Sequence, residues 1–538
     1  MRVLAALALA LLLAGCVQTS TTSSTGPSGT PPTLDVGNGS GMGTNAGTDW
    51  AAKIVGDHGG VFETHRHWEN HTGLSTPNFI ELAHDPLGIA AFEGATAGGY
   101  FCGGQASTDA GQHITVISSF DTSVAFVVVD STDPLHPIHL GDYILDNAQT
   151  YDVDVTPDGK HVAVAADLGP QQPPPGSVAS DLLAARGTAV LHASFRDGCT
   201  GEVRSLGPDQ TVAAGPSTIL VSLADPKAPA FEDLVPSPVL GPHSVSTALI
   251  NGHTYVAASI TNLVHQASYY QFFEVTTVPA VPGVAGPGKL VLLSVFDAAQ
   301  YGATAAVNGH VDAEISLHPV TKQAVVYISD WDGGLIVLDF SIPQLPRLLS
   351  QWQDTGADSG AVHSTRSLDG VYDGHHYLLV GQEFVGHPVN RPSGWIYILD
   401  DTDPANVKEV GRWTLPVDVE QDWHGVELFS THYFRVLNDT VFVAMYHGGV
   451  WAFKLDFAHP EALATPRSVG AFVPDQNAPR GRVANDGYEY APFVLDVFPY
   501  PDGTLVIYDG LSGVYVVQYD SSKDMPSPTP WPREGKTL

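Results

Sequence analysis

One short phrase recurs along the chain and limits what the chain can fold into. It is an apolar run that ends in an acidic or polar residue and is usually followed by a turn containing proline, as in GGLIVLDFSIPQLP at 333–346. Further copies lie at 125–137, 218–229, 269–282, 394–406, 448–462 and 512–520. After a long first interval the copies follow one another every 50–65 residues or so, a typical spacing for a repeat protein. A long internal repeat therefore outweighs the expectation of three or four separate domains that 538 residues would otherwise raise.

Each repeat divides into four short strands. In the fourth copy these are expected at 310–317, 324–329, 335–339 and 347–352, with Val-, Ile-, Tyr- and Phe-rich runs between turn residues. A single sheet of this size cannot bury both of its faces, so the copies must stack around an axis. The sequence predicts an all-β, seven-bladed β-propeller of four-stranded antiparallel blades over residues 49–522. Proline then ends the third strand, and the aspartate before it accepts N–H groups in the turn.

Three segments depart from the regular repeat. The last repeat lacks a fourth strand, and we expect residues 49–64 to supply it, so that an N-terminal strand closes the ring. Residues 168–216 form a long insertion in the second blade, which we expect to cover or flank a binding surface. Residues 523–538 are predicted to be a disordered tail.

The recurring phrase resembles the LVIVD repeat, whose consensus runs Gly-Gly-Leu-x-Val-Ile-Asp followed by an Asp-Pro turn. The resemblance covers most of residues 78–520 and is clearest at 310–456. It implies a propeller located outside the cytoplasm, and it implies almost nothing about an activity.

The first residues have the pattern of a targeting segment. Met1 and Arg2 precede an apolar run at 3–13 that is too short to span a bilayer. Leu13-Ala14-Gly15-Cys16 resembles the lipobox of secreted lipoproteins, in which the chain is cut before the cysteine and its sulfur carries a diacylglycerol. We therefore expect a signal peptide at 1–15, lipidation of Cys16 and a flexible tether at 16–48, with the protein anchored outside the cytoplasm. An ordinary signal peptide with an incidental cysteine is the alternative.

Composition restricts the partners. With 23 Lys and Arg against 57 Asp and Glu, the formal net charge is −34, which argues against nucleic acid as a partner. This acidity fits either solubility in a salty medium or attraction for cations. The cysteines at Cys102 and Cys199 form a disulfide or remain thiols, and sequence does not decide between these.

Histidines and acids gather where function is expected. The start of the first strand and the end of the second strand of each blade lie on the same rim. Four histidines stand near first-strand starts: His243, His310, His363 and His432. Four further candidates stand at second-strand ends: Asp330, Asp332, Glu383 and His447. The histidines are candidate ligands of Zn, Cu or Fe, with the second group orienting them. Two other interpretations stay open: a water-lined channel, and an acidic Ca²⁺ pocket.

Two functions from different classes remain. One is a surface binding or scaffold module that recognises a protein or glycan through the histidine-bearing rim. The other is a metal-dependent enzyme, redox or hydrolytic, with its metal at the channel mouth. The sequence favours the binding module, because no complete catalytic set can be assembled from it and no nucleophile-elbow, zincin or Cys-x-x-Cys motif is present.

Overall fold

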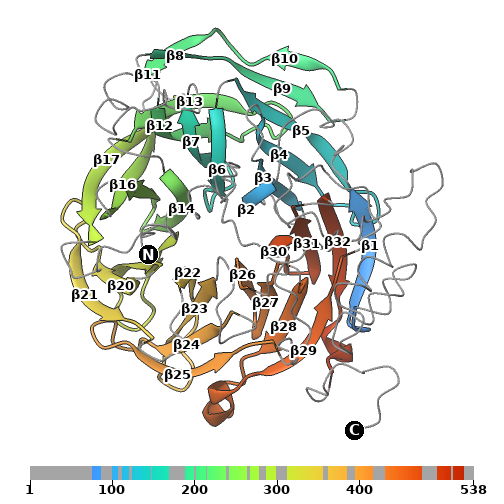
Figure 1. The fold of residues 1–538 in the computed structure, drawn as a ribbon, viewed down its shortest axis with the longest axis vertical. Helices are drawn as coiled ribbons and strands as arrows, with labels where there is room; N and C mark the ends of the chain where they lie inside the picture. Colours follow the sequence, from blue (N-terminus) through green and yellow to red (C-terminus); the bar gives the residue numbers. More distant parts are fainter. Residues whose placement is uncertain are drawn as a thin grey trace, which may run out of the picture.

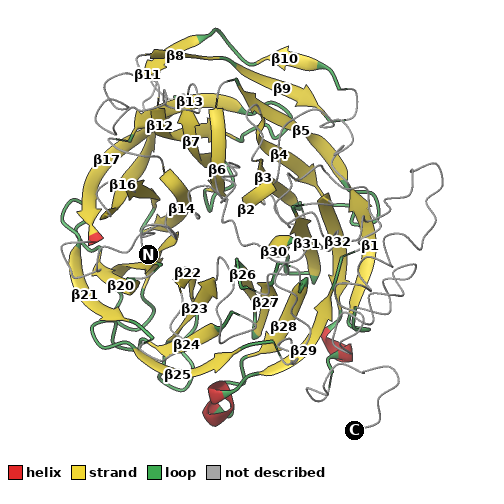
Figure 2. Ribbon diagram, viewed as in Figure 1, coloured by secondary structure: helices red, strands yellow, loops and turns green. Residues whose placement is uncertain are grey.

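The described part of the chain is built almost entirely of β-strands arranged in a ring (Figures 1 and 2). The computed structural model describes residues 75–85, 100–106, 112–119, 124–146, 148–168, 188–198, 201–213, 215–237, 242–262, 267–277, 286–298, 312–331, 333–354, 361–383, 394–415, 430–446, 448–474, 493–510 and 513–525. No helix within these ranges is long and apolar enough to cross a membrane.

Seven antiparallel sheets form the blades, which confirms the predicted fold class. Blade 1 contains β2 (Tyr100–Ala106), β3 (Ile114–Ser119), β4 (Val124–Asp130) and β5 (Ile138–Leu145), and blade 2 contains β6 (Ala148–Val155), β7 (His161–Leu168), β12 (Gly215–Ser222) and β13 (Ala230–Pro236). Blade 3 contains β14 (Pro242–Ile250), β15 (His253–Asn262), β16 (Ala267–Thr277) and β17 (Gly288–Asp297), and blade 4 contains β18 (Asp312–Leu317), β19 (Ala324–Asp330), β20 (Gly334–Asp339) and β21 (Arg347–Trp352). Blade 5 contains β22 (Ala361–Ser367), β23 (Tyr377–Glu383), β24 (Ile396–Asp400) and β25 (Lys408–Trp413), and blade 6 contains β26 (Phe434–Leu437), β27 (Thr440–Ala444), β28 (Val450–Lys454) and β29 (Arg467–Phe472). Blade 7 contains β30 (Val494–Pro499), β31 (Thr504–Asp509), β32 (Gly513–Tyr519) and β1 (Phe79–Asp85).

The middle strands read as unbroken apolar runs because each blade is covered on both faces. In β23, Leu378 and Val380 belong to the apolar cluster shared with blade 4, whereas Leu379 belongs to the cluster shared with blade 6. Successive side chains of a strand point to opposite faces, so both faces need apolar residues. The hydrophobic core is therefore divided into layers between neighbouring blades.

The turn after the third strand is capped as its sequence predicts. Asp130, Asp339 and Asp400 each accept a hydrogen bond from the backbone N–H two residues later, at 2.9, 2.9 and 3.0 Å. The recurring aspartate thus fixes the reversal into the fourth strand.

The ring closes through an N-terminal strand, as predicted, but the segment was misplaced. The strand that completes blade 7 is β1, which pairs antiparallel with β32 from Phe79 opposite Tyr519 to Asp85 opposite Val514. The expected segment 49–64 lies outside the described residues. The sequence FIELAHD was overlooked because it is an edge strand with acidic residues, and Phe79 is the one strongly buried side chain among those described in it.

The insertion in blade 2 contributes four short strands. These are β8 (Thr188–Leu191), β9 (Ala193–Asp197), β10 (Val203–Ser205) and β11 (Gln210–Ala213). β8 pairs with β11, while β9 pairs with β5 and extends blade 1 to six strands on its outer side (Figure 1). Arg196 on β9 fastens this addition, since its Nε donates to Asp142 Oδ2 at 2.6 Å. The described strands of the insertion therefore cover the outer edge of blade 1.

Side chains of the inner strands bind the backbone of the next blade. Asp152 and Asp154 on β6 accept hydrogen bonds from the N–H groups of Val245 and Thr247 on β14, at 3.0 and 2.7 Å. Glu314 on β18 accepts one from Ser367 on β22 at 2.8 Å in the same way. These bonds hold neighbouring blades in register around the axis.

Candidate functional site

The two faces of the ring differ in their connections. On one face the strands are joined by short turns, such as the capped turns after β4, β20 and β24. On the other face, which we call the long-loop face, lie the connections from Glu383 to Ile396, from Trp413 to Phe434 and from Phe472 to Val494. First-strand starts and second-strand ends meet on the long-loop face, as the pairing of Ala361 with Glu383 illustrates.

Three of the residues singled out in the sequence lie together on the long-loop face, and we call them the 5/6 cluster. His363 is on β22, Glu383 ends β23, and His432 precedes β26; their exposed fractions are 3%, 5% and 1%. One potential ligand atom of each residue lies within 4.8 Å of the others. His363 Nε2 is 3.4 Å from Glu383 Oε2, and the two imidazole centroids are 4.7 Å apart.

Backbone carbonyls define the protonation of both rings. His363 Nδ1 is 3.1 Å from the carbonyl oxygen of His432, and His432 Nδ1 is 2.8 Å from the carbonyl oxygen of Leu495. A carbonyl oxygen only accepts, so each Nδ1 carries the proton and donates it. In the neutral ring the electron pair is therefore on Nε2, the nitrogen that His363 turns toward Glu383.

Burial decides the charge of these groups. It raises the pKa of Glu383 to about 8, even though the hydroxyl of Tyr446 donates a hydrogen bond to Oε1. Burial lowers the pKa of His432 to about 3, so that this ring is neutral at pH 7. At pH 7 the Glu383 carboxyl is thus largely protonated unless a cation joins it.

Two aromatic residues beside the 5/6 cluster have unusual backbone conformations. Trp331 follows β19 with φ of 23°, and Tyr446 follows β27 with φ of 47°. The ring of Trp331 is 6.1 Å from that of His363, and the ring of Tyr446 is 5.1 Å from that of His432. Bulky residues seldom adopt positive φ, and such strain gathers at functional sites. Both precede a Gly-Gly pair, in WDGG and YHGG, a pattern that could have revealed them in the sequence.

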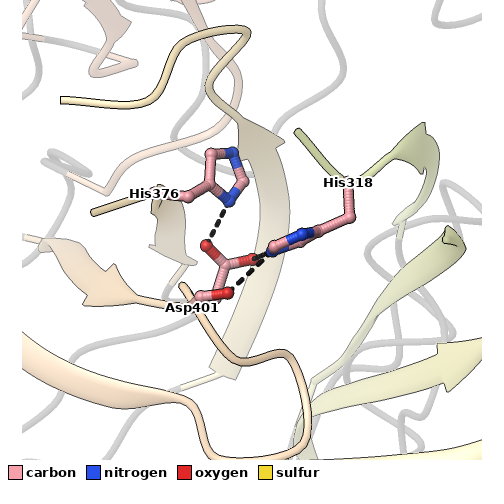
Figure 3. Close-up of side chains that lie close together, drawn as sticks. All are labelled: His318, His376 and Asp401. Atoms are coloured by element: carbon pink, nitrogen blue, oxygen red, sulfur yellow. Dashed lines mark hydrogen bonds and ion pairs between the residues drawn. The ribbon is translucent and has the colours of Figure 1, made fainter. Parts of the chain in front are cut away.

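A second buried group of His318, His376 and Asp401 lies on the opposite face, between blades 4 and 5 (Figure 3). His318 uses both ring nitrogens: Nε2 donates to the carbonyl oxygen of Asp401 at 2.8 Å, and Nδ1 accepts from the N–H of Thr321 at 3.0 Å. No electron pair of this ring is left for a metal. The sequence analysis did not select these three residues.

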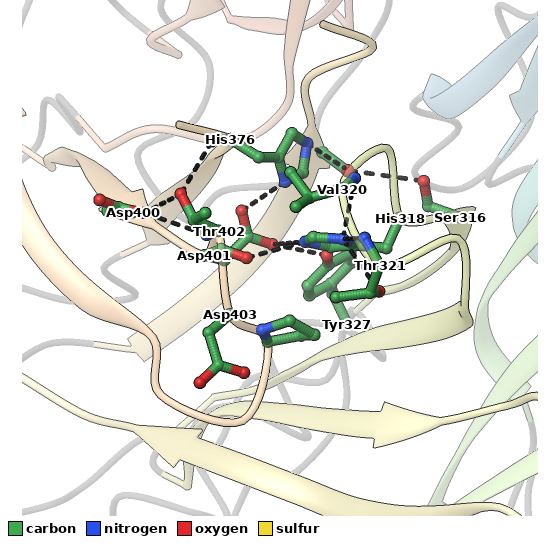
Figure 4. A network of polar contacts seen from close by, with 12 residues as sticks. Ser316, His318, Val320, Thr321, Tyr327, His376, Asp400, Asp401, Thr402 and Asp403 are labelled. Atoms are coloured by element: carbon green, nitrogen blue, oxygen red, sulfur yellow. Dashed lines mark hydrogen bonds and ion pairs between the residues drawn. The ribbon is translucent and has the colours of Figure 1, made fainter. Parts of the chain in front are cut away.

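The other two side chains contact the protein on several sides, although His376 Nδ1 and Asp401 Oδ1 face each other without a hydrogen bond (Figure 4). His376 Nε2 donates to the carbonyl oxygen of Leu368 at 2.7 Å, and its Nδ1 lies 2.5 Å from Asp401 Oδ1. Tyr327 donates to Asp401 Oδ2 at 2.5 Å. The group joins the turns of blades 4 and 5, and we assign it a structural role.

Of the other predicted site residues, the two that the structure describes do not belong to the 5/6 cluster. His243 starts β14 and keeps some exposed surface; burial lowers its pKa to about 4, and its ring is 6.2 Å from that of Tyr151. Asp330 is buried at the end of β19. The remaining candidates lie outside the described residues or have side chains that the structure does not describe: His310, Asp332, His447, Cys16, Cys102 and Cys199.

Comparison with known proteins finds similar solved structures, at low identity and low TM-score. No family model matches the chain, and no curated protein matches it. Among solved structures, the computationally designed Ika8 protein is 10% identical with a TM-score of 0.37, covering 82% of this chain and 100% of that one. The WD40 β-propeller domain of Doa1 is 8% identical with a TM-score of 0.37, covering 83% of this chain and 99% of that one. These similarities carry no argument about this chain, and the propeller architecture rests on its own sheet topology.

Proposed function

We propose that this protein is an LVIVD-repeat propeller, anchored by lipid outside the cytoplasm, that acts as a surface binding or scaffold module through its long-loop face. The observation that carries the proposal is the asymmetry of the two faces. One face consists of short turns capped by their own aspartates, whereas the other gathers the long connections, the strained aromatic residues and the 5/6 cluster. Recognition residues are commonly placed on loops that a rigid scaffold positions.

The location rests on the N-terminal sequence. The short apolar run and Leu13-Ala14-Gly15-Cys16 support export and lipidation. A Cys16→Ser form is then expected in the soluble fraction, because it lacks the acyl chains that hold the protein on the membrane. Equal membrane attachment of the two forms would refute the lipid anchor.

The partner is expected to be a protein or a glycan, since the net charge of −34 repels nucleic acid. Steric blocking of each face separately tests the proposal. A cysteine placed at Gln353, exposed just beyond β21 on the long-loop face, is compared with one placed at Leu345, 55% exposed in a turn of the opposite face. Both are introduced into a chain whose Cys102 and Cys199 are serines and are then coupled to a bulky polyethylene glycol.

Binding is measured on a glycan array and against an extracytoplasmic protein fraction. We expect the polymer at residue 353 to abolish binding and the polymer at residue 345 to leave it intact. Equal effects at both positions, or binding lost only at residue 345, would contradict recognition through the long-loop face.

A metal-dependent enzyme is the second candidate function. The 5/6 cluster favours it, because it brings two imidazoles and a carboxyl together on the face where substrates would enter. Such an activity first requires a bound metal.

A further inference from the structure

We propose that His363, Glu383 and His432 bind one divalent first-row transition metal through two imidazole Nε2 atoms and one carboxylate oxygen. The site would join blade 5, which provides His363 and Glu383, to blade 6, which provides His432. The proposal does not depend on recognition by the long-loop face. It differs from the sequence-based expectation, because Glu383 becomes a ligand and His243 and His310 are not required.

The spacing of the ligand atoms fits a metal. Bonds of about 2.0–2.2 Å to nitrogen and oxygen place two ligands of a tetrahedral ion roughly 3.5 Å apart. The separation of 3.4 Å between His363 Nε2 and Glu383 Oε2 has this value. The third ligand atom lies within 4.8 Å, so a modest rotation of the His432 side chain completes the set.

Each ligand is held from the side away from the metal. The backbone carbonyls of His432 and Leu495 fix the two rings through Nδ1, an outer contact typical of metal-binding histidines. Tyr446 donates to Glu383 Oε1 and so fixes the carboxyl with Oε2 toward His363. His363 Nε2 and Glu383 Oε2 are therefore oriented toward each other before any ion arrives, and the His432 ring supplies the third ligand after a small rotation.

A cation would also balance the buried carboxylate. Glu383 is 5% exposed, and within the described ranges the basic side chain beside its carboxyl is that of His363 rather than a lysine or arginine. An ionised carboxylate in such surroundings is costly unless a cation accompanies it. A divalent ion between the carboxylate and two neutral imidazoles removes this cost.

The donor set indicates the class of metal. Two imidazoles and one carboxylate are the ligands of non-haem Fe(II) sites and of many catalytic zinc sites, which keep positions open for water or substrate. The His318 group has a similar composition, but its His318 ring has both nitrogens engaged. His318 therefore has no electron pair left for a metal, whatever its neighbours contribute.

Co²⁺ is a suitable probe, because its visible absorption depends on how many ligands coordinate the ion. The full chain, purified without a histidine tag and stripped of metal, is titrated with Co²⁺, and Zn²⁺ and Fe²⁺ are then tested as competitors. We expect one Co²⁺ per chain, displaced by Zn²⁺. Glu383→Gln retains the size of the side chain and an oxygen for Tyr446, and we expect it to weaken Co²⁺ binding by more than the roughly 10–100-fold typical of losing an outer partner. His432→Gln should do the same.

His243→Ala is the matched control, since His243 lies in blade 3 and is excluded from the proposed ligands. We expect its affinity for Co²⁺ to match that of the wild type. Far-UV circular dichroism and the unfolding midpoint without metal are measured to check that each variant folds. If a histidine variant does not fold, Glu383→Gln alone decides whether the cluster binds the metal. Absence of stoichiometric uptake would overturn the proposal, as would Co²⁺ binding that survives Glu383→Gln. A loss in His243→Ala equal to that in Glu383→Gln would overturn the three-ligand set in favour of a four-histidine site.

Discussion

Closure of the ring by β1 makes Phe79 a sensitive position. Its side chain is 4% exposed and packs against Tyr519, with centroids 5.2 Å apart, and against Phe442, with centroids 6.2 Å apart. Replacing a buried phenylalanine by alanine costs about 3–5 kcal/mol. Aromatic pairs add about 0.5–1.5 kcal/mol to the stabilisation from buried area. We therefore expect Phe79→Ala to lower the free energy of unfolding by an amount in the upper half of the range of about 3–5 kcal/mol. The loss falls on contacts that join β1 to β32 and to β27 of the neighbouring blade 6.

Guanidinium unfolding followed by tryptophan fluorescence measures this loss. The m value increases with the surface that unfolding exposes, and we take about 5 kcal/mol/M for a chain of this length. The denaturant midpoint should then fall by roughly 0.8–1 M. Ile80→Ala is the control, because Ile80 is the next residue on the same strand but is 41% exposed. Its midpoint should change by less than a fifth as much. A shift for Phe79→Ala no larger than that for Ile80→Ala would refute the claim that β1 closes the core.

Three further predictions concern the 5/6 cluster and Glu314 on β18. Tyr446→Phe retains the ring beside His432 but removes the hydrogen bond to Glu383. The affinity for Co²⁺ should therefore fall about 10–100-fold in the titration described above. An unchanged affinity would show that Tyr446 does not orient the Glu383 carboxyl for the metal. Burial raises the pKa of Glu314 from 4.5 to about 7, so the folded state binds this proton more tightly than the unfolded state. Its stabilising effect is complete below pH 4.5 and is lost as the pH rises through 7. Between pH 4.5 and 8 the free energy of unfolding of the wild type should therefore fall by on the order of 1–3 kcal/mol more than that of Glu314→Gln. Equal decreases in the two proteins would contradict the raised pKa of Glu314. Finally, Zn²⁺ should raise the unfolding midpoint of the metal-free wild type but not that of Glu383→Gln, since a ligand that binds only the folded state stabilises it.

The fold could be predicted largely because its repeat is local in sequence. Apolar runs bounded by glycine and Asp-Pro turns place the strands of blade 4 within two residues of β18, β19, β20 and β21. The closing strand could not be located in the same way. Its partner β32 lies more than 400 residues away, and an edge strand needs only one buried face, so FIELAHD carries little apolar signal.

The site was predicted only in part. Propeller geometry places His363, Glu383 and His432 on one rim, but a sequence does not show which rim residues converge. The roles of the rings depend on carbonyl groups of His432 and Leu495, which every residue possesses. For the same reason the His318 group was missed, because its contacts are largely with backbone atoms.

The pairing of β1 with β32 also determines on which face of the ring the described chain begins and ends. Phe79 pairs with Tyr519 at the face of short turns, and the N–H of Asp520 donates to the carbonyl oxygen of Asn78 at 2.8 Å. The chain thus enters and exits side by side, on the side away from the long-loop face. A fluorescent protein or a surface linkage attached directly at residue 75 or residue 525 would therefore start from the face of short turns and leave the long-loop face uncovered.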